Sequence, residues 1–423
     1  MNDERAHGFL PRFPSQVVAA MIMRLAGRAA AAHHLMVPKL RVLNRDHVYI
    51  ATQGELEDFC REAAGERVIA VDTEFLREKT YYPKLCLVQV RAGEKIAAID
   101  PILIGNLAPL ARIFENPEVT KVFHACSQDL EVIQSGMGCT CRSVFDTQLA
   151  AAFLGLRQQI SYGSLVESYC DVHLAKAESL TDWSRRPLDP EQLTYAEDDV
   201  RYLPGIYERM VSELIERDRL AWVAPEMEAL TDPAHVTRAP EEAYLRLKRS
   251  GSLTRRQLAV AREACAWRER LAAARDVPRK WVLSDEVIVE VCKRVPRGAD
   301  RLRRIRGTEQ LSPRDAEELV AAVSRGVACP AGECPQVQRH VRPSAETESV
   351  IDLMYAMLRV ISEKTGVATQ LIATRDDLQD FVTNRRKSRL STSWRWELAG
   401  STLARLLDGE VGLTVKDGRI EML

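Results

Sequence analysis

The sequence is short of aromatic residues, of net charge and of uninterrupted apolar stretches. Phe, Trp and Tyr make up 6% of its 423 residues, while 46% are hydrophobic and 28% charged, as in a globular protein with ample core material. A formal net charge of −1 excludes no class of partner by itself. The apolar stretch at 17–32 is interrupted by Arg24 and Arg28, which excludes a membrane span and a clean signal peptide. We expect no membrane partner.

Disulfide and zinc-finger patterns are also missing. The ten cysteines are scattered, and the closest pairs are Cys139 with Cys141 and Cys329 with Cys334. Neither pair has a second pair or a histidine cluster at zinc-site spacing. We therefore expect reduced thiols and a cytoplasmic location, because the cytosol keeps thiols reduced.

Basic and acidic residues are distributed unevenly along the chain. Residues 238–325 hold 21 Lys and Arg against 13 Asp and Glu, a net of +8, so the rest of the chain sums to −9. A basic segment attached to a more acidic body favours an anionic partner for that segment. The length allows about two to four domains.

Folded structure is expected to begin near His47, after a poorly ordered extension at residues 1–46 to which we assign no function. Thr52 and Glu55 have the spacing of a capping box. Apolar runs predict strands at 48–50, 68–71, 85–90, 95–99 and 121–124, and other patterns predict helices at 52–64, 129–135, 146–154, 162–169 and 191–219. Strands followed by alternating helices and strands favour an α/β domain with a mixed sheet.

Strand patterns stop after Trp222, and Pro225, Pro233 and Pro240 mark a linker. Residues 241–323 have a helical, basic pattern, and 346–423 form another mainly helical unit. We expect this helical half to be a separable appendage, so that a chain ending near Thr231 remains an active catalytic unit.

Two carboxylates stand at the end of the apolar strand, in the run Val71-Asp72-Thr73-Glu74. Side chains alternate faces along a strand, so Asp72 and Glu74 point the same way, roughly 7 Å apart. Converging carboxylates repel each other unless a cation lies between them, and oxygen ligands select Mg²⁺ or Mn²⁺ over zinc. Taken alone, the pair is a weak signal, because two acids in this pattern are common and more often are solvated side chains at a strand-end turn.

Two more acidic motifs follow. Asp129 lies near the start of a predicted helix, where an acid also fits the helix dipole. Tyr195 and Asp199 are four residues apart and share one face of a predicted helix. Asp198 points about 100° away from Asp199 on that helix, which favours Asp199 as a ligand.

Together these residues occur in the order and spacing of the three exonuclease motifs of the DEDD superfamily, and a Tyr four residues before the last Asp marks the DEDDy branch. Around them the sequence resembles the ribonuclease D family over about 49–219, and more weakly to the C-terminus. The matching stretches are 71–75, 80–83, 87–89, 123–130, 145–149, 181–183 with 186–188, and 195–200. Residues 241–323 resemble the helicase-and-RNase-D C-terminal (HRDC) domain.

The resemblance implies an α/β ribonuclease-H-like exonuclease domain with a mixed sheet at 47–224. It is followed by all-α helical HRDC-type domains at 240–325 and, less closely matched, 345–423. The implied activity is a 3′→5′ exoribonuclease that releases nucleoside 5′-monophosphates and acts on tRNA precursors, with no obligate protein partner. A DEDDy exonuclease acting on DNA and a non-catalytic RNA-binding scaffold are the alternatives, although the chain has no Walker loop of a linked helicase.

The same resemblance implies residue roles. The metal ligands for two divalent ions, Mg²⁺ or Mn²⁺, are Asp72, Glu74, Asp129 and Asp199, and Tyr195 orients the attacking water. Asp146 is expected to be a helix N-cap and not a ligand. Family-like stretches also offer candidate substrate-binding residues, for each of which a packing role is an alternative: His124, Gln89, Trp183 and Arg186.

Overall fold

The computed structural model describes residues 47–174, 181–232, 239–336 and 343–423. The predicted N-terminal extension at 1–46 lies outside the described residues, so its expected disorder stays a prediction. Within the described ranges, no helix combines the length and the apolar character needed to cross a membrane.

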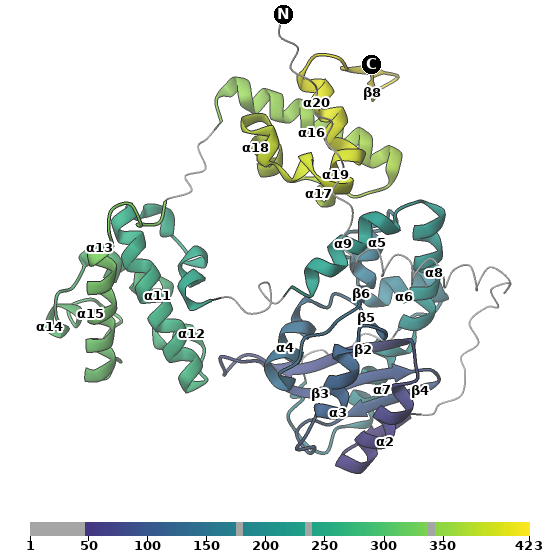
Figure 1. Cartoon of the computed structure of the whole chain (residues 1–423), viewed down its shortest axis with the longest axis horizontal. Helices are drawn as coiled ribbons and strands as arrows, with labels where there is room; N and C mark the ends of the chain where they lie inside the picture. The colour runs from purple at the N-terminus through teal and green to yellow at the C-terminus, as the bar shows by residue number, and fades with distance from the viewer. Residues whose placement is uncertain (1–46, 175–180, 233–238, 337–342) are drawn as a thin grey trace, which may run out of the picture.

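A six-stranded mixed sheet forms the centre of the first domain (Figure 1). The strand order is β1-β4-β3-β2-β5-β6, where β3 runs antiparallel to both β2 and β4 and the other pairs are parallel. The predicted α/β domain with a mixed sheet is therefore confirmed. The strands are β1 (His47–Ile50), β2 (Val68–Leu76), β3 (Lys84–Ala92), β4 (Lys95–Ile99), β5 (Thr120–Phe123) and β6 (Val144–Asp146).

The sheet is covered by helices on both faces. One apolar core joins Ile69, Val71 and Val88 of the sheet to α2 (Gln53–Ala63), α3 (Ala108–Glu115) and α4 (Ser127–Met137). The opposite face carries Ala70 and Val122. It packs against α5 (Thr147–Phe153), α6 (Tyr162–Cys170), α7 (Pro190–Arg201), α8 (Leu203–Glu216) and α9 (Leu220–Leu230).

Local signals explain where several of these helices begin. Thr52 and Glu55 form the predicted capping box at the start of α2. The single helix predicted over 191–219 is wrong: it is two helices, α7 and α8, that meet at Tyr202. Pro204 lies in the first turn of α8, and because proline has no N–H to donate, it favours a new helix start there.

The linker predicted around Pro225 is also wrong at that residue, because Pro225 lies inside α9. Helix α9 buries Leu220, Val223 and Met227 in the core. That burial outweighs the hydrogen bond which proline removes from a helix interior.

The basic segment forms a helical unit with its own apolar core. Its helices are α11 (Arg255–Arg275), α12 (Arg279–Val282), α13 (Asp285–Arg294), α14 (Ala299–Leu302) and α15 (Pro313–Ala328). Helices α11 and α15 pack backbone to backbone at Gly326, where a Cβ atom would lie 2.4 Å from the Cα of Val260. This unit contacts the sheet domain through Tyr81, whose hydroxyl donates to Glu269 at 2.9 Å, and through Asp276, which accepts from the amides of Tyr81 and Tyr82.

The last unit is helical except at its end. Its helices are α16 (Ala345–Thr365), α17 (Thr369–Ile372), α18 (Arg375–Thr383), α19 (Ser393–Arg395) and α20 (Ser401–Leu407). A hairpin of β7 (Leu413–Lys416) and β8 (Arg419–Met422) closes the chain and was not predicted. Its signal is the Asp417-Gly418 turn, where both residues have positive φ as a tight hairpin requires.

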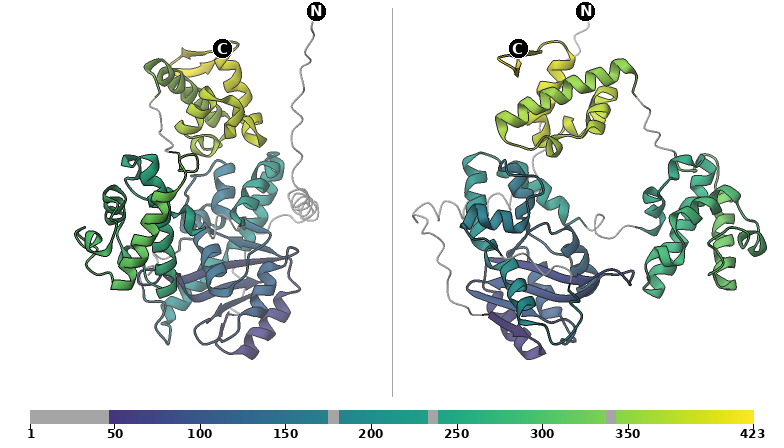
Figure 2. Two further views of the ribbon diagram at one scale, coloured as in Figure 1. Left: turned by 60° about the vertical axis from the view of Figure 1, so that its left-hand side comes forward. Right: turned by 180° about the vertical axis from the view of Figure 1, so that it is seen from behind.

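This C-terminal unit is not a separable appendage. Its apolar residues belong to the same core cluster as α5, α8 and α9, and Figure 2 shows the unit beside those helices. Trp394 packs edge-on against Phe153 and its Nε1 donates to Glu226 at 2.9 Å; Arg395 pairs with the same carboxylate. We therefore revise the expectation that a chain ending near Thr231 remains an active catalytic unit, because that cut would remove the C-terminal unit and expose this core to water.

Trp394→Ala should destabilise the protein. Trp394 is 2% exposed at the junction of the two units, whereas Trp281 on α12 is 54% exposed and serves as the matched control. We expect a loss of about 3–5 kcal/mol for Trp394→Ala, typical of a buried Trp, and within about 0.5 kcal/mol of no change for Trp281→Ala. Urea denaturation of the full chain measures both. Equal midpoints for the two variants would mean that the C-terminal unit does not stabilise the catalytic domain.

Candidate active site

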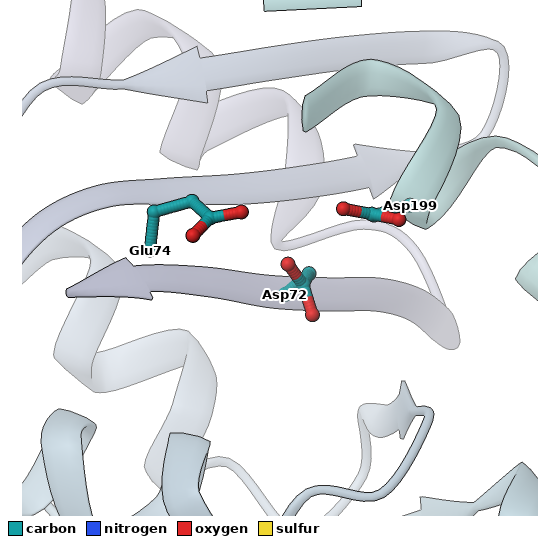
Figure 3. Close-up of side chains that lie close together, drawn as sticks. All are labelled: Asp72, Glu74 and Asp199. Atoms are coloured by element: carbon teal, nitrogen blue, oxygen red, sulfur yellow. The ribbon is translucent and has the colours of Figure 1, made fainter. Parts of the chain in front are cut away.

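Three carboxylates converge where the middle of β2 faces the C-terminal half of α7. Asp72 and Glu74 come from β2 and Asp199 from α7, and one oxygen of each lies within 4.8 Å of the others (Figure 3). The strand alternation that predicted a shared face for Asp72 and Glu74 places both toward α7. Two segments more than a hundred residues apart in sequence thus build one acidic group.

Helix α7 is fixed in place at its first turn and along the sheet. Asp189 and Gln192 form a capping box ahead of Pro190, and the helix packs across β2, β3 and β4. Tyr195 and Asp199 lie one turn apart on the face toward the carboxylates, and the Tyr195 hydroxyl donates a hydrogen bond to Asp199. The Tyr195 ring also contacts the buried Trp183 ring, with centroids 6.0 Å apart.

Asp129 stands next to this acidic group without belonging to it. It lies in the first turn of α4, where its Oδ1 accepts from the Thr73 hydroxyl at 2.5 Å. Of the four predicted metal ligands, the structure thus brings three together and directs the fourth to Thr73. Thr73 was not among the predicted site residues, although its position between Asp72 and Glu74 in the sequence could have indicated that it lies near the site.

The Asp146 carboxylate caps one helix and also accepts hydrogen bonds from a neighbouring turn. It is the N-cap of α5, as predicted, and accepts from the amides of Gln148 and Leu149. It also accepts from the amides of Ala125 at 3.1 Å and Cys126 at 2.9 Å. Ala125 has φ +61°, a left-handed conformation that is unusual for a residue with a Cβ. Asp146 therefore stabilises the strained turn from which α4 and Asp129 start.

Burial, with repulsion from acidic neighbours, raises the pKa of the four predicted metal ligands. Burial, followed by the charges of Asp199 and Asp129, raises the pKa of Glu74 to about 8. Burial raises the pKa of Asp199 to about 7 and that of Asp129 to about 6. The pKa of Asp72 is also well above its usual value, through burial and then its three acidic neighbours. Without a cation, the site stabilises protons on groups that are normally ionised at neutral pH.

The donor set fits a hard divalent cation. All its members are carboxylates, with no cysteine or histidine in the group that the described residues form. Oxygen-only sites favour Mg²⁺ or Mn²⁺ over softer metals. Such a cation would neutralise the repulsion that raises these pKa values.

The four candidate substrate residues are all engaged in the protein or buried. Arg186 pairs with Asp100 and donates to the carbonyls of Cys86 and Trp183 at 2.7 Å, so it braces the loop that precedes α7. Both ring nitrogens of His124 have partners, the Thr147 hydroxyl and the Ile160 carbonyl. Trp183 is packed beneath Tyr195, and Gln89 is buried in β3. A substrate role for these residues stays a prediction, and their surroundings favour the packing alternative.

The metal-free protein should lose stability as pH rises from about 6 to 8. A carboxyl group whose pKa is higher in the folded chain than in the unfolded chain stabilises the fold while protonated, and that contribution disappears as pH rises through the folded pKa. For Asp199 and Glu74 the folded values are about 7 and about 8. Glu74→Gln removes one of these titrating groups and should make the fall in stability less steep.

Thermal melts in EDTA across this pH range measure the effect, with Glu57→Gln on the exposed side of α2 as the control. If wild type and Glu74→Gln show the same pH dependence, Glu74 is not protonated in the folded metal-free protein.

Comparison with known proteins agrees with this geometry. Residues 47–215 match the family model described as 3′-5′ exonuclease, and residues 257–323 match the HRDC domain model. The first match covers β1 to α8 and the second covers most of α11 to α15.

Relatives match over nearly their whole length. The chain is 39% identical over 386 residues to a ribonuclease D of Jannaschia sp. (strain CCS1), covering 88% of this chain and 98% of the relative. It is 37% identical over 381 residues to a ribonuclease D of Acidiphilium cryptum, covering 89% and 97%. The crystal structure of Escherichia coli RNase D, an exoribonuclease involved in structured RNA processing, superposes with a TM-score of 0.77 at 30% identity, covering 86% of this chain and 99% of that one. The chain belongs to the ribonuclease D family and is a 3′→5′ exoribonuclease.

Proposed function

We propose that this enzyme hydrolyses RNA from the 3′ end with the help of two divalent cations, Mg²⁺ or Mn²⁺, and releases nucleoside 5′-monophosphates. The observation that carries the proposal is the convergence of Asp72, Glu74 and Asp199 within 4.8 Å. Three carboxylates with raised pKa values are costly to bury unless a cation neutralises them.

Each acidic residue has a proposed part. Asp72, Glu74 and Asp199 would hold the ions directly, and Asp129 would join them by leaving the Thr73 hydroxyl. When bound, a pair of ions activates the attacking water and stabilises charge on the leaving oxygen. Tyr195, whose hydroxyl already lies at Asp199, would orient that water by a hydrogen bond. Water would thus replace the 3′ oxygen of the penultimate nucleotide on phosphorus, so that the last nucleotide leaves as a 5′-monophosphate. The leaving oxygen takes a proton and becomes the new 3′ hydroxyl of the shortened RNA.

We propose that the helical units bind the RNA substrate. We divide the chain into an exonuclease domain at 47–224, an HRDC domain at 240–325 and a second HRDC-like domain at 345–423. The separate core of α11–α15 supports the middle boundary, and the net charge of +8 over 238–325 suits the phosphates of a structured RNA. Precursors of tRNA in the cytoplasm are the substrate we propose.

An assay on RNA with a defined 3′ end tests the proposal against its alternatives. We expect stepwise shortening in Mn²⁺ or Mg²⁺, release of 5′-monophosphates and no cleavage in EDTA. The matching DNA oligonucleotide in the same buffers tests the DNA alternative, which faster cleavage of DNA would favour. If the protein binds RNA but cleaves neither oligonucleotide in any of the buffers, the non-catalytic RNA-binding scaffold would be favoured.

Asp199→Ala should abolish hydrolysis, with Asp198→Ala as its control. Asp198 is the next residue on α7, but its carboxylate pairs with Arg201 at 2.7 Å and is absent from the acidic group. We expect Asp198→Ala to keep activity within several-fold of wild type, since it removes a part-buried ion pair with Arg201 and no member of the acidic group. Turnover measured at saturating Mn²⁺ compares them. Wild-type turnover by Asp199→Ala would remove Asp199 from the site.

Tyr195→Phe should slow the reaction while leaving binding intact. The change removes the hydroxyl that reaches Asp199 and keeps the ring packed on Trp183. We expect a fall of about 10²–10⁴-fold, typical of losing a group that positions a proton-transferring partner, with unchanged affinity for Mn²⁺ and RNA. Single-turnover kinetics at saturating Mn²⁺ gives the rate. A variant within about twofold of wild type would show that the hydroxyl does not take part.

A further inference from the structure

Gln89 in the middle of β3 is a buried polar side chain without a partner. It is 0% exposed, and neither its Nε2 nor its Oε1 has a hydrogen bond. A carboxamide buried in this way destabilises a fold compared with a hydrogen-bonded one, because it has lost its contacts with water and gained none in return. A buried polar group without a partner needs an explanation, and one explanation is a hydrogen bond that forms in another state of the protein, such as the metal-bound state.

The sheet register places Gln89 beside the acidic group. Gln89 pairs directly with Asp72 of β2 on one side and with Ala98 of β4 on the other. Paired residues point to the same face of a sheet, with Cβ atoms about 4.5–5.5 Å apart. This is the face that α7 covers, with Ala196 and Trp183 packed over the neighbouring Leu87.

Of the two residues that pair with Gln89 across the sheet, Asp72 is the one that offers a side-chain acceptor, whereas Glu74 lies on the same face but one diagonal step further away, opposite Leu87. Ala98 and Leu87 are apolar, and Arg91, two residues along β3, is a donor that is already bonded to the Arg201 carbonyl. Asp72 in turn has no side-chain donor among the described residues; its one stabilising contact is with the Thr73 backbone. An unused donor and an unused acceptor thus lie opposite each other on adjacent strands.

We propose that Gln89 is a positioning residue, whose carboxamide donates a hydrogen bond to Asp72 and holds that carboxylate in the orientation that binds the catalytic cation. The inference rests on the proposed metal-dependent function. A carboxylate that gives one oxygen to a cation has a second oxygen free to accept, and such outer partners commonly fix the ligand. Full burial argues against a direct contact of Gln89 with RNA.

The test uses Gln89→Met in the full-length chain, which keeps length and packing but has no donor. Gln257→Leu is the control: Gln257 is a half-buried glutamine in the first turn of α11, far along the chain from the acidic group, and its Oε1 accepts from the Thr254 amide at 2.9 Å. Calorimetric titration with Mn²⁺ alone gives metal affinity, and melting in EDTA gives stability. Gln89→Leu, with a different shape, repeats both measurements.

We expect Gln89→Met to weaken Mn²⁺ binding about 10- to 100-fold. Its melting temperature in EDTA should stay at or above that of wild type, because an unsatisfied group has been removed. Gln257→Leu should melt at a lower temperature, because it removes the capping box of α11, and should bind Mn²⁺ normally. A wild-type Mn²⁺ affinity in both Gln89 variants, while wild type binds and uses Mn²⁺, would overturn the role of Gln89 alone. Absence of Mn²⁺ binding by wild type would overturn the proposed function as well.

Discussion

Repulsion among half-buried carboxylates is the constraint on which the rest of this structure depends. Asp72, Glu74 and Asp199 are held within 4.8 Å of one another by a central strand and a helix that cannot easily separate. The surrounding apolar core stabilises that arrangement, because β2 lies between β3 and β5, whose residues are mostly buried. The same repulsion that destabilises the metal-free chain is what gives the group its affinity for divalent cations.

The two helical units contact the exonuclease domain at different places. Beyond Glu74, β2 leads to the loop that carries Tyr81, which the first helical unit holds through Glu269 and Asp276. On the other side, α9 gives Glu226 to Trp394 and Arg395 of the C-terminal unit. One helical unit thus contacts the exonuclease domain through a few hydrogen bonds and the packed ring of Tyr81, whereas the other shares its apolar core. The two helical units are therefore unequal parts of the molecule.

The sequence predicted the mixed sheet and the shared face of Asp72 and Glu74 because strand alternation is local. It could not show that Asp129 bonds to Thr73 or that Asp146 holds the turn at Ala125, since both depend on contacts between distant elements. Helix α9 was missed at Pro225 because tertiary burial outweighed a local helix-breaking signal. The place of Gln89 depended on strand register, which pairs it with Asp72 and which no short window of sequence reveals.

The number and coupling of bound ions test the central claim most directly. Electron paramagnetic resonance of the full-length protein titrated with Mn²⁺ counts the ions and detects magnetic coupling between them. We expect two Mn²⁺ per chain, coupled as ions about 3.5–4 Å apart should be, and loss of the coupled pair in Asp199→Ala. A single bound ion, or two uncoupled ions that survive the loss of Asp199, would contradict a two-metal site built on Asp72, Glu74 and Asp199.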